Sequence, residues 1–286
     1  MRTKCLIVLS ILALGLSSCR NSRSPKLIVK LVVDPTQARL GNNGLPSALP
    51  DENAGQNPQF NSLSAHYLEL APTAYTQLGE GQVLYHAPET TKGGDNAIDF
   101  RRSIVVAPNE VWLEIPLSDL EAGTYEWVRL SLSYQNYDIV FHYDGQPYNA
   151  TLASFVGFNQ YIRSFDIGEE TVEVNENKLQ GFWAFKSLAG IQTGQTPEGG
   201  TTVPNPLSST SPIPAGSCVV TGRFSDALVI SGDETEDLTL TMSLSTNNSF
   251  EWVDSNGNGN WDVGQGNGES VVDMGLRGLQ PSYDWQ

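Results

Sequence analysis

Basic residues are scarce in this chain, which has 16 Lys and Arg against 32 Asp and Glu and a formal net charge of −16 at pH 7. Nucleic acids and anionic lipid head groups are bound chiefly through Lys and Arg, so a surface with this balance repels both. The composition therefore excludes nucleic acid as a partner and predicts a surface that attracts cations.

A hydrophobic run of membrane-spanning length is also missing, because a bilayer crossing needs about 20 apolar residues. The main apolar run covers residues 6–16 and is shorter than that. Arg2 and Lys4 precede it, and the small residues Ser17 and Ser18 follow it. This order is typical of a secretory signal peptide and predicts the removal of residues 1–18.

Residues 16–19, Leu-Ser-Ser-Cys, resemble the lipobox of bacterial lipoproteins. The resemblance implies that the Cys19 thiol is acylated, that Cys19 becomes the new N-terminus, and that residues 19–25 tether the protein to a lipid bilayer. Two or more acyl chains anchor a protein stably, whereas one does not. Because an Asp after the cysteine retains some Gram-negative lipoproteins at the inner membrane, Arg20 implies an outer-membrane lipoprotein on the periplasmic or exposed side. The alternative is ordinary secretion with a free Cys19.

Cysteine is rare, with three in the chain. Once Cys5 leaves with the signal peptide and Cys19 is acylated, Cys218 alone remains, which excludes an intrachain disulfide. Cys218 shares one face of an alternating segment with Val220 and Phe224. That setting predicts a buried, inert thiol rather than a catalytic one.

Helical periodicity is absent over any stretch of a dozen residues, and alternation with a period of two dominates instead. It is clearest in residues 27–33, 128–134 and 238–245, with a bulge expected near Trp127. Further strands are predicted at residues 65–70, 98–106, 111–115, 137–143, 151–156, 160–167, 170–174, 180–186 and 217–230. Many short strands separated by turn residues are typical of a β-sandwich. We therefore predict an all-β fold with one large domain over residues 26–286.

Two segments rich in Pro, Gly and Asn or Ser, residues 34–64 and 189–216, are expected to be long loops. Residues 118–125 place Gly123 and Tyr125 after Leu120. This pattern resembles the strand start of secreted Ig-like and transthyretin-like bacterial domains, which implies a sandwich of one of these types.

Residues 254–265 match the frame of a 12-residue calcium loop. Such a loop has oxygen donors at positions 1, 3, 5, 7 and 9, a glycine at 6 and an acid at 12. The corresponding residues are Asp254, Asn256, Asn258, Asn260 through its carbonyl, Asp262, Gly259 and Gln265. The segment resembles EF-hand and dockerin-type loops, which implies a structural calcium ion.

Two features depart from that pattern. Gln265 offers one neutral oxygen where the acid usually stands, although Glu269 or Asp273 could substitute for it. The residues before the loop predict a strand rather than a helix, and few of the donors are charged. We therefore expect weak affinity, on the order of 10⁻⁴ to 10⁻³ M. The alternative is a pair of Asn-Gly turns that join two strands.

Other constellations are weaker. His66, His86 and His142 could converge on a metal ion, but no two of them have metal-ligand spacing. Acid pairs could serve glycoside hydrolysis, yet such pairs are expected by chance in an acidic chain. Aromatic residues could line a glycan-binding face or fill a core: Tyr134, Tyr137, Phe141, Tyr143, Tyr148, Phe155, Phe158, Tyr161 and Phe165.

Taken together, the chain resembles uncharacterised β-rich surface lipoproteins of Gram-negative bacteria, through its lipobox, its alternating strands and its calcium-type loop. The resemblance implies a lipid-anchored β-sandwich of the cell envelope that is not an enzyme and binds a protein or glycan ligand, with calcium as a stabilising ion. The alternatives are an envelope carbohydrate-active enzyme and a metal-handling lipoprotein that uses the histidines.

Overall fold

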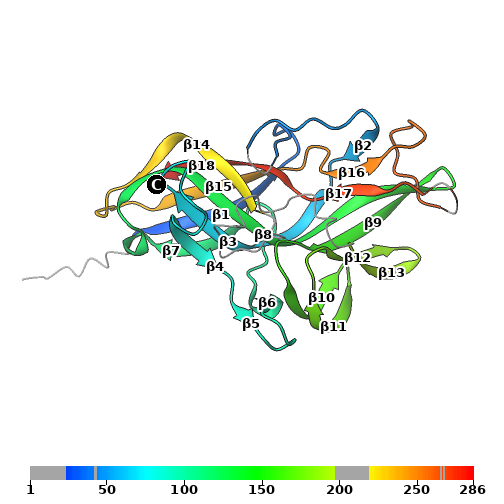
Figure 1. The fold of residues 1–286 in the computed structure, drawn as a ribbon, viewed down its shortest axis with the longest axis horizontal. Helices are drawn as coiled ribbons and strands as arrows, with labels where there is room; N and C mark the ends of the chain where they lie inside the picture. Colours follow the sequence, from blue (N-terminus) through cyan, green and yellow to red (C-terminus); the bar gives the residue numbers. More distant parts are fainter. Residues whose placement is uncertain (1–23, 42–43, 197–218, 265, 267) are drawn as a thin grey trace, which may run out of the picture.

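The computed structural model describes residues 24–41, 44–196, 219–264, 266 and 268–286 (Figure 1). Within these residues the regular structure consists of β-strands and two short 3₁₀ helices, so the predicted all-β class is confirmed. The signal peptide, Cys19, most of the tether, Cys218 and Gln265 lie outside the described residues. The described residues include no helix that is long and apolar enough to cross a bilayer.

The strands pair into four sheets whose strand orders are β18-β15-β1-β7, β13-β12-β9-β8-β3-β4 with β14 also on β8, β11-β10-β6-β5, and β17-β16-β2. The strand bounds are β1 Lys26–Asp34, β2 Asn53–Gln56, β3 Gln59–Ala71, β4 Gln82–His86, β5 Glu89–Thr90, β6 Ala97–Asp99, β7 Val111–Pro116, β8 Gly123–Tyr143, β9 Gln146–Phe155, β10 Gln160–Ile167, β11 Glu170–Lys178, β12 Phe182–Ser187, β13 Gly190–Gln195, β14 Val219–Ile230, β15 Leu238–Ser245, β16 Phe250–Val253, β17 Val271–Met274 and β18 Arg277–Trp285. The 3₁₀ helices are η1 Phe100–Arg102 and η2 Leu117–Asp119.

The main core lies between the sheet β18-β15-β1-β7 and the part of the largest sheet built from β3, β14 and the first half of β8. Alternate residues of β1, including Leu27, Val29 and Leu31, are fully buried there. They meet the equally buried alternate residues of β15, with which β1 pairs in parallel. The two sheets form a sandwich, because each alternating strand can bury only one of its faces.

Strand β8 is 21 residues long and continues beyond this sandwich. Its second half and β9 form the floor of a second layered region, whose roof is the three-stranded sheet β17-β16-β2. Tyr137 and Ile139 of the floor pack against Phe250 and Trp252 of the roof. The register of the β8–β14 pair shifts near Trp127, where the bulge was expected.

The opposite face of β9 and β12 is covered by the small sheet β11-β10-β6-β5, around Phe155, Phe165 and Phe182. The stacked regions give the molecule an elongated shape (Figure 1). At one end of the molecule, the backbone N–H groups of Lys26 and Gln286 both donate hydrogen bonds to Asp237. Strands β12, β13, β16 and β17 lie toward the other end (Figure 1).

Several predicted boundaries were wrong, and residues 128–134 and 137–143, expected as separate strands, belong to the single strand β8. The expected loop 189–216 contains strand β13, and the expected loop 34–64 contains β2 and the start of β3. The strand expected at 98–106 ends at Asp99, because the next residues turn through η1 and carry Phe100 onto Tyr134 and Phe155.

Candidate ligand cavity and calcium-type loop

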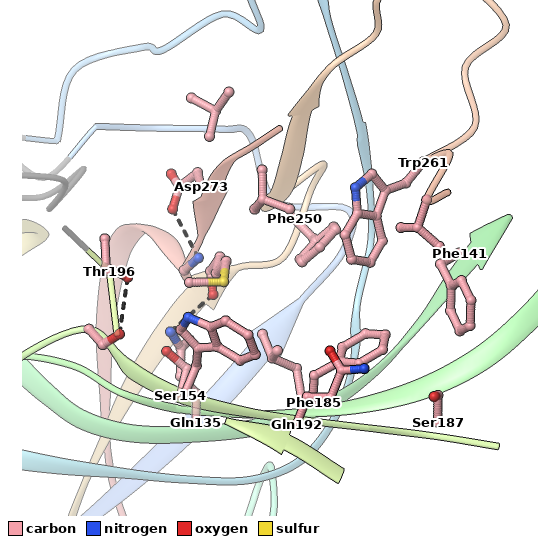
Figure 2. Close-up of a pocket in the computed structure, with 18 of the residues that line it drawn as sticks. Gln135, Phe141, Ser154, Phe185, Ser187, Gln192, Thr196, Phe250, Trp261 and Asp273 are labelled. Carbon is pink, nitrogen blue, oxygen red and sulfur yellow. Dashed lines mark hydrogen bonds between the residues drawn. The ribbon is translucent and has the colours of Figure 1, made fainter. Parts of the chain in front are cut away.

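A cavity of about 950 Å³ lies between floor strands β8, β9, β12 and β13 and a roof formed by β16, β17 and the calcium-type loop. Figure 2 shows Phe250 and Trp261 on the roof side and Ser154, Phe185 and Gln192 on the floor side. The aromatic residues that line the cavity are Phe141, Tyr143, Tyr148, Trp183, Phe185, Phe250 and Trp261. Such a volume is in the usual range for small-molecule sites, about 300–1,000 Å³.

The cavity floor follows from alternation along the strands. In β12, Phe182 and Ala184 point into the core beneath the sheet, whereas Trp183 and Phe185 point into the cavity. Both faces of β12 are therefore apolar, which is typical of a strand that is covered on both sides.

A row of cavity residues crosses four neighbouring strands. Gln135 of β8 pairs with Ser154 of β9, Ser154 with Trp183 of β12, and Trp183 with Gly194 of β13. A Cβ atom on Gly194 would lie 2.2 Å from Cζ2 of Trp183, so the indole fills the space above this glycine. The absent side chain at position 194 allows the indole to lie across the edge strand of the floor.

The polar groups in the cavity wall are few. Gln135 is buried and donates from Nε2 to the Met274 carbonyl at 3.1 Å, while its Oε1 is buried without a hydrogen-bond partner. Asp273, the only charged residue in the described lining, forms an ion pair with Arg277. Its charge is thus compensated, and the cavity presents a neutral surface to a ligand.

Trp261 connects the cavity to the calcium-type loop, because it lies between the two donor positions Asn260 and Asp262. Its ring centroid is 4.9 Å from that of Phe250 and 6.0 Å from that of Phe185. Its Nε1 donates to the Glu269 carbonyl at 3.3 Å. The indole is thereby held in the roof by the same segment that carries the loop.

Four of the predicted donor residues converge in this loop. The Asp262 Oδ2 accepts hydrogen bonds from Nδ2 of Asn256 and of Asn258, at 2.7 and 2.9 Å, and these bonds lower the pKa of Asp262. Asp254 accepts from the backbone N–H of Asn258 at 3.1 Å and of Gly259 at 2.9 Å. Gly259 has φ +72°, the left-handed turn that the frame requires.

Glu269, named as a possible substitute for the acid at position 12, closes the loop. It is buried, and its Oε1 accepts from the Ser255 N–H at 2.8 Å, while Oε2 accepts from the Asp262 N–H at 3.0 Å. Asp273 lies instead with Arg277 in the cavity wall.

The donor set of the loop consists of oxygens, which is the type that calcium prefers, and amides outnumber acids in it. Across the described ranges, no group of three or more His, Cys, Asp and Glu is placed to hold a metal ion. The oxygen atoms of Asp254, Asn256, Asn258 and Asp262 are the donors that a weak, amide-rich calcium loop would use. Asn260 adds a backbone contact, since its N–H donates to Oδ1 of Asn258 at 2.7 Å.

The loop is joined to the end of β8 by backbone hydrogen bonds. The His142 N–H donates to the Trp261 carbonyl and the Val263 N–H to the His142 carbonyl, both at 2.8 Å. The loop, the Trp261 indole and the end of the cavity floor thus form one connected unit.

The three histidines do not come together in the structure as a metal-binding group. His66 is buried on β3, and its Nε2 lies 2.6 Å from the Ser131 hydroxyl. Burial, with a smaller contribution from His86, lowers the pKa of His66 to about 3. His86 is partly exposed on β4, and His142 is at the end of β8 beside the calcium-type loop.

Sequence reasoning found part of the cavity. Of the aromatic residues suggested for a glycan-binding face, Phe141, Tyr143 and Tyr148 line it, and the others do not. Gln135 and Trp183 were missed, although the apolar residues on both faces of 182–185 already indicated a strand that is covered on both sides.

In comparisons with known proteins, the chain matches no family model, and no curated protein or solved structure is significantly similar to it.

Proposed function

We propose that this protein is a lipid-anchored, non-enzymatic binding protein of the bacterial outer membrane, and that a ligand occupies the cavity beneath Trp261. The observation that carries the proposal is the cavity itself, a space of about 950 Å³ with aromatic walls and few polar groups. That combination is the usual form of a ligand site. The exposed apolar residues Tyr143, Leu188 and Val272 at its lining support access from solvent.

The arrangement of the fold supports the anchor. Strand β1 begins at Lys26, seven positions after Cys19, and this end of the molecule is opposite the cavity (Figure 1). An acylated Cys19 would therefore hold the sandwich at the membrane and present the cavity away from it. Intact-mass measurement of native material tests this: we expect acyl chains on a chain that starts at Cys19. An unmodified thiol or an uncleaved signal peptide would contradict the anchor.

Calcium in loop 254–265 would stabilise the cavity roof. Gly- and Asn-rich loops lose much conformational entropy on ordering, and a bound cation would offset this loss by bringing Asp254, Asp262 and the amide oxygens together. Because Trp261 lies inside the loop, the ion would also fix the position of the indole over the cavity.

Thermal unfolding with added calcium tests this role. With a dissociation constant on the order of 10⁻⁴ to 10⁻³ M, about 10 mM calcium should stabilise the protein by about 1–3 kcal/mol, which raises the melting temperature by several degrees. Asp254→Ala combined with Asp262→Ala should abolish the shift, and Asp95→Ala, an exposed acid outside the loop, should retain it. A wild-type melting curve that calcium does not move would refute the calcium site.

The two alternative functions have less support in the site. Glycoside hydrolysis commonly uses two carboxyl groups on either side of the bond, and the described cavity lining has the single, ion-paired Asp273. A histidine metal site would need ligands that converge, whereas His66 is buried away from the calcium-type loop that His142 adjoins. We therefore favour binding without catalysis.

A further inference from the structure

We propose that the ligand of the cavity is a neutral oligosaccharide. This inference rests on the proposed binding function and adds the chemical class of the ligand. Three independent features of the cavity wall carry it: its charge, its aromatic surfaces and an exposed carboxamide on its floor.

The charge of the wall excludes anionic ligands. The described lining has no Lys, Arg or His, and its one carboxylate, Asp273, already pairs with Arg277. A fatty acid, a phosphorylated head group or a uronic acid would have to leave water without a cationic partner, which is costly. A cationic ligand would likewise find no free carboxylate in the described wall. A neutral ligand can enter the cavity without this free-energy cost of desolvating a charge.

The aromatic surfaces are arranged on two sides. Trp183 lies across Gly194 on the floor, and Trp261 packs against Phe250 and Phe185 on the roof. The C–H faces of a pyranose ring pack well on large aromatic surfaces of this kind, in which an apolar body is combined with a polar edge. A cavity of about 950 Å³ with aromatic residues on both sides has room for a chain of sugar rings.

The polar groups distinguish a sugar from a purely apolar molecule. Gln192 of β13 is exposed and pairs in register with Phe185 of β12, so its carboxamide lies on the cavity face of the floor. An alkyl chain lying over it would take this amide out of water without offering a hydrogen bond, which is unfavourable. Sugar hydroxyls both donate and accept, so they match the carboxamide of Gln192.

Binding is tested by tryptophan fluorescence and calorimetry on the purified protein, with cellohexaose, maltohexaose, xylohexaose, mannohexaose and chitohexaose as neutral probes. An oligogalacturonate hexamer is the anionic counterpart. We expect saturable binding of at least one neutral probe at micromolar to millimolar concentration, and binding of the anionic hexamer that is weaker by about tenfold or more.

Substitutions test whether the probe binds in the cavity. Trp183→Ala should weaken binding of the probe by about tenfold or more, and Gln192→Leu, at an exposed position of the floor, should weaken it severalfold. Trp127→Ala, which removes a tryptophan outside the cavity lining, should leave the affinity unchanged. Equal affinity in Trp183→Ala and wild type would overturn the assignment.

The failure of this inference can be distinguished from the failure of the proposed function. The neutral apolar probes 1-hexadecanol and N-phenyl-1-naphthylamine are titrated in parallel. If either of them binds in a manner that depends on Trp183 while every neutral hexasaccharide fails at millimolar concentration, the glycan class is wrong and the cavity remains a ligand site. If none of the probes binds, both proposals are refuted.

Discussion

Acidification should destabilise this protein through His66 before its carboxylates are protonated. The imidazole is buried on β3, and its Nε2 lies 2.6 Å from the Ser131 hydroxyl. Its pKa is lowered to about 3, chiefly because the charged form would lose its hydration. In the unfolded chain the same group has a pKa near 6.5. The unfolded state therefore binds more protons between these two values.

The sign and size of the effect follow from linkage. Stability from the neutral imidazole is fully present above pH 6.5 and falls as the pH decreases from 6.5 toward 3. Each pH unit inside this window costs about 1.4 kcal/mol, so the loss between pH 7 and pH 5 should be about 2 kcal/mol. Asp34, Glu234 and Asp262 also have lowered pKa values, but their stabilising contribution is lost mainly below about pH 4.5, outside the measured interval.

The assay is urea unfolding at pH 7 and pH 5, followed by tryptophan emission. His66→Gln keeps a polar side chain opposite Ser131 but does not titrate, so its unfolding free energy should change by less than about 0.5 kcal/mol between the two pH values. His86→Gln, at the partly exposed neighbour, should behave as wild type does. An identical pH dependence in His66→Gln and wild type would refute the reasoning, because the lost stability would then come from another group.

Two further substitutions test the packing of the sheets. Gly194→Ala forces the Trp183 indole off the cavity floor, and we expect a loss of about 1–3 kcal/mol in unfolding free energy with a shift in tryptophan emission. Gly123→Ala, whose new Cβ meets no atom closer than 3.6 Å, is the control that should leave the emission unchanged. Arg129→Met removes the cation beside the fully buried Glu69 and should cost about 3–5 kcal/mol in urea unfolding, while adding Glu69→Leu should restore part of it. No loss in Arg129→Met would show that the buried pair is not formed.

Strands that bury one face by alternation could be predicted from the sequence. Residues 160–167 were expected as a strand and form β10 with the same bounds. Strands β2 and β13 could not be predicted, because Asn-Ala-Gly-Gln and Gly-Ile-Gln-Thr-Gly-Gln show no apolar alternation. Both exist because a neighbouring strand offers backbone hydrogen-bond partners, which is a tertiary effect.

The calcium-type loop and the cavity differ in the same way, because one depends on local sequence and the other on tertiary structure. The calcium-type loop is local, so its candidate donors could be proposed from spacing, and the structure brings Asp254, Asn256, Asn258 and Asp262 together. The cavity depends on sheet register and joins residues as distant in sequence as Gln135 and the roof. Apolar residues on both faces of one strand indicate that both faces are covered, but they cannot show what covers them.

The cavity exists where the roof is too small for the floor. The roof strands β2, β16 and β17 have four residues each, whereas β8 and β9 beneath them have 21 and 10, and the cavity extends over β12 and β13 at the edge of the floor. Polar contacts hold much of this roof: buried Glu251 pairs with Arg39 and Arg277, and Arg277 also pairs with Asp273. Paired buried charges contribute little net stability compared with apolar packing. The roof should therefore open before the sandwich does, and a cation that orders the loop around Trp261 would act on the least stable wall of the site.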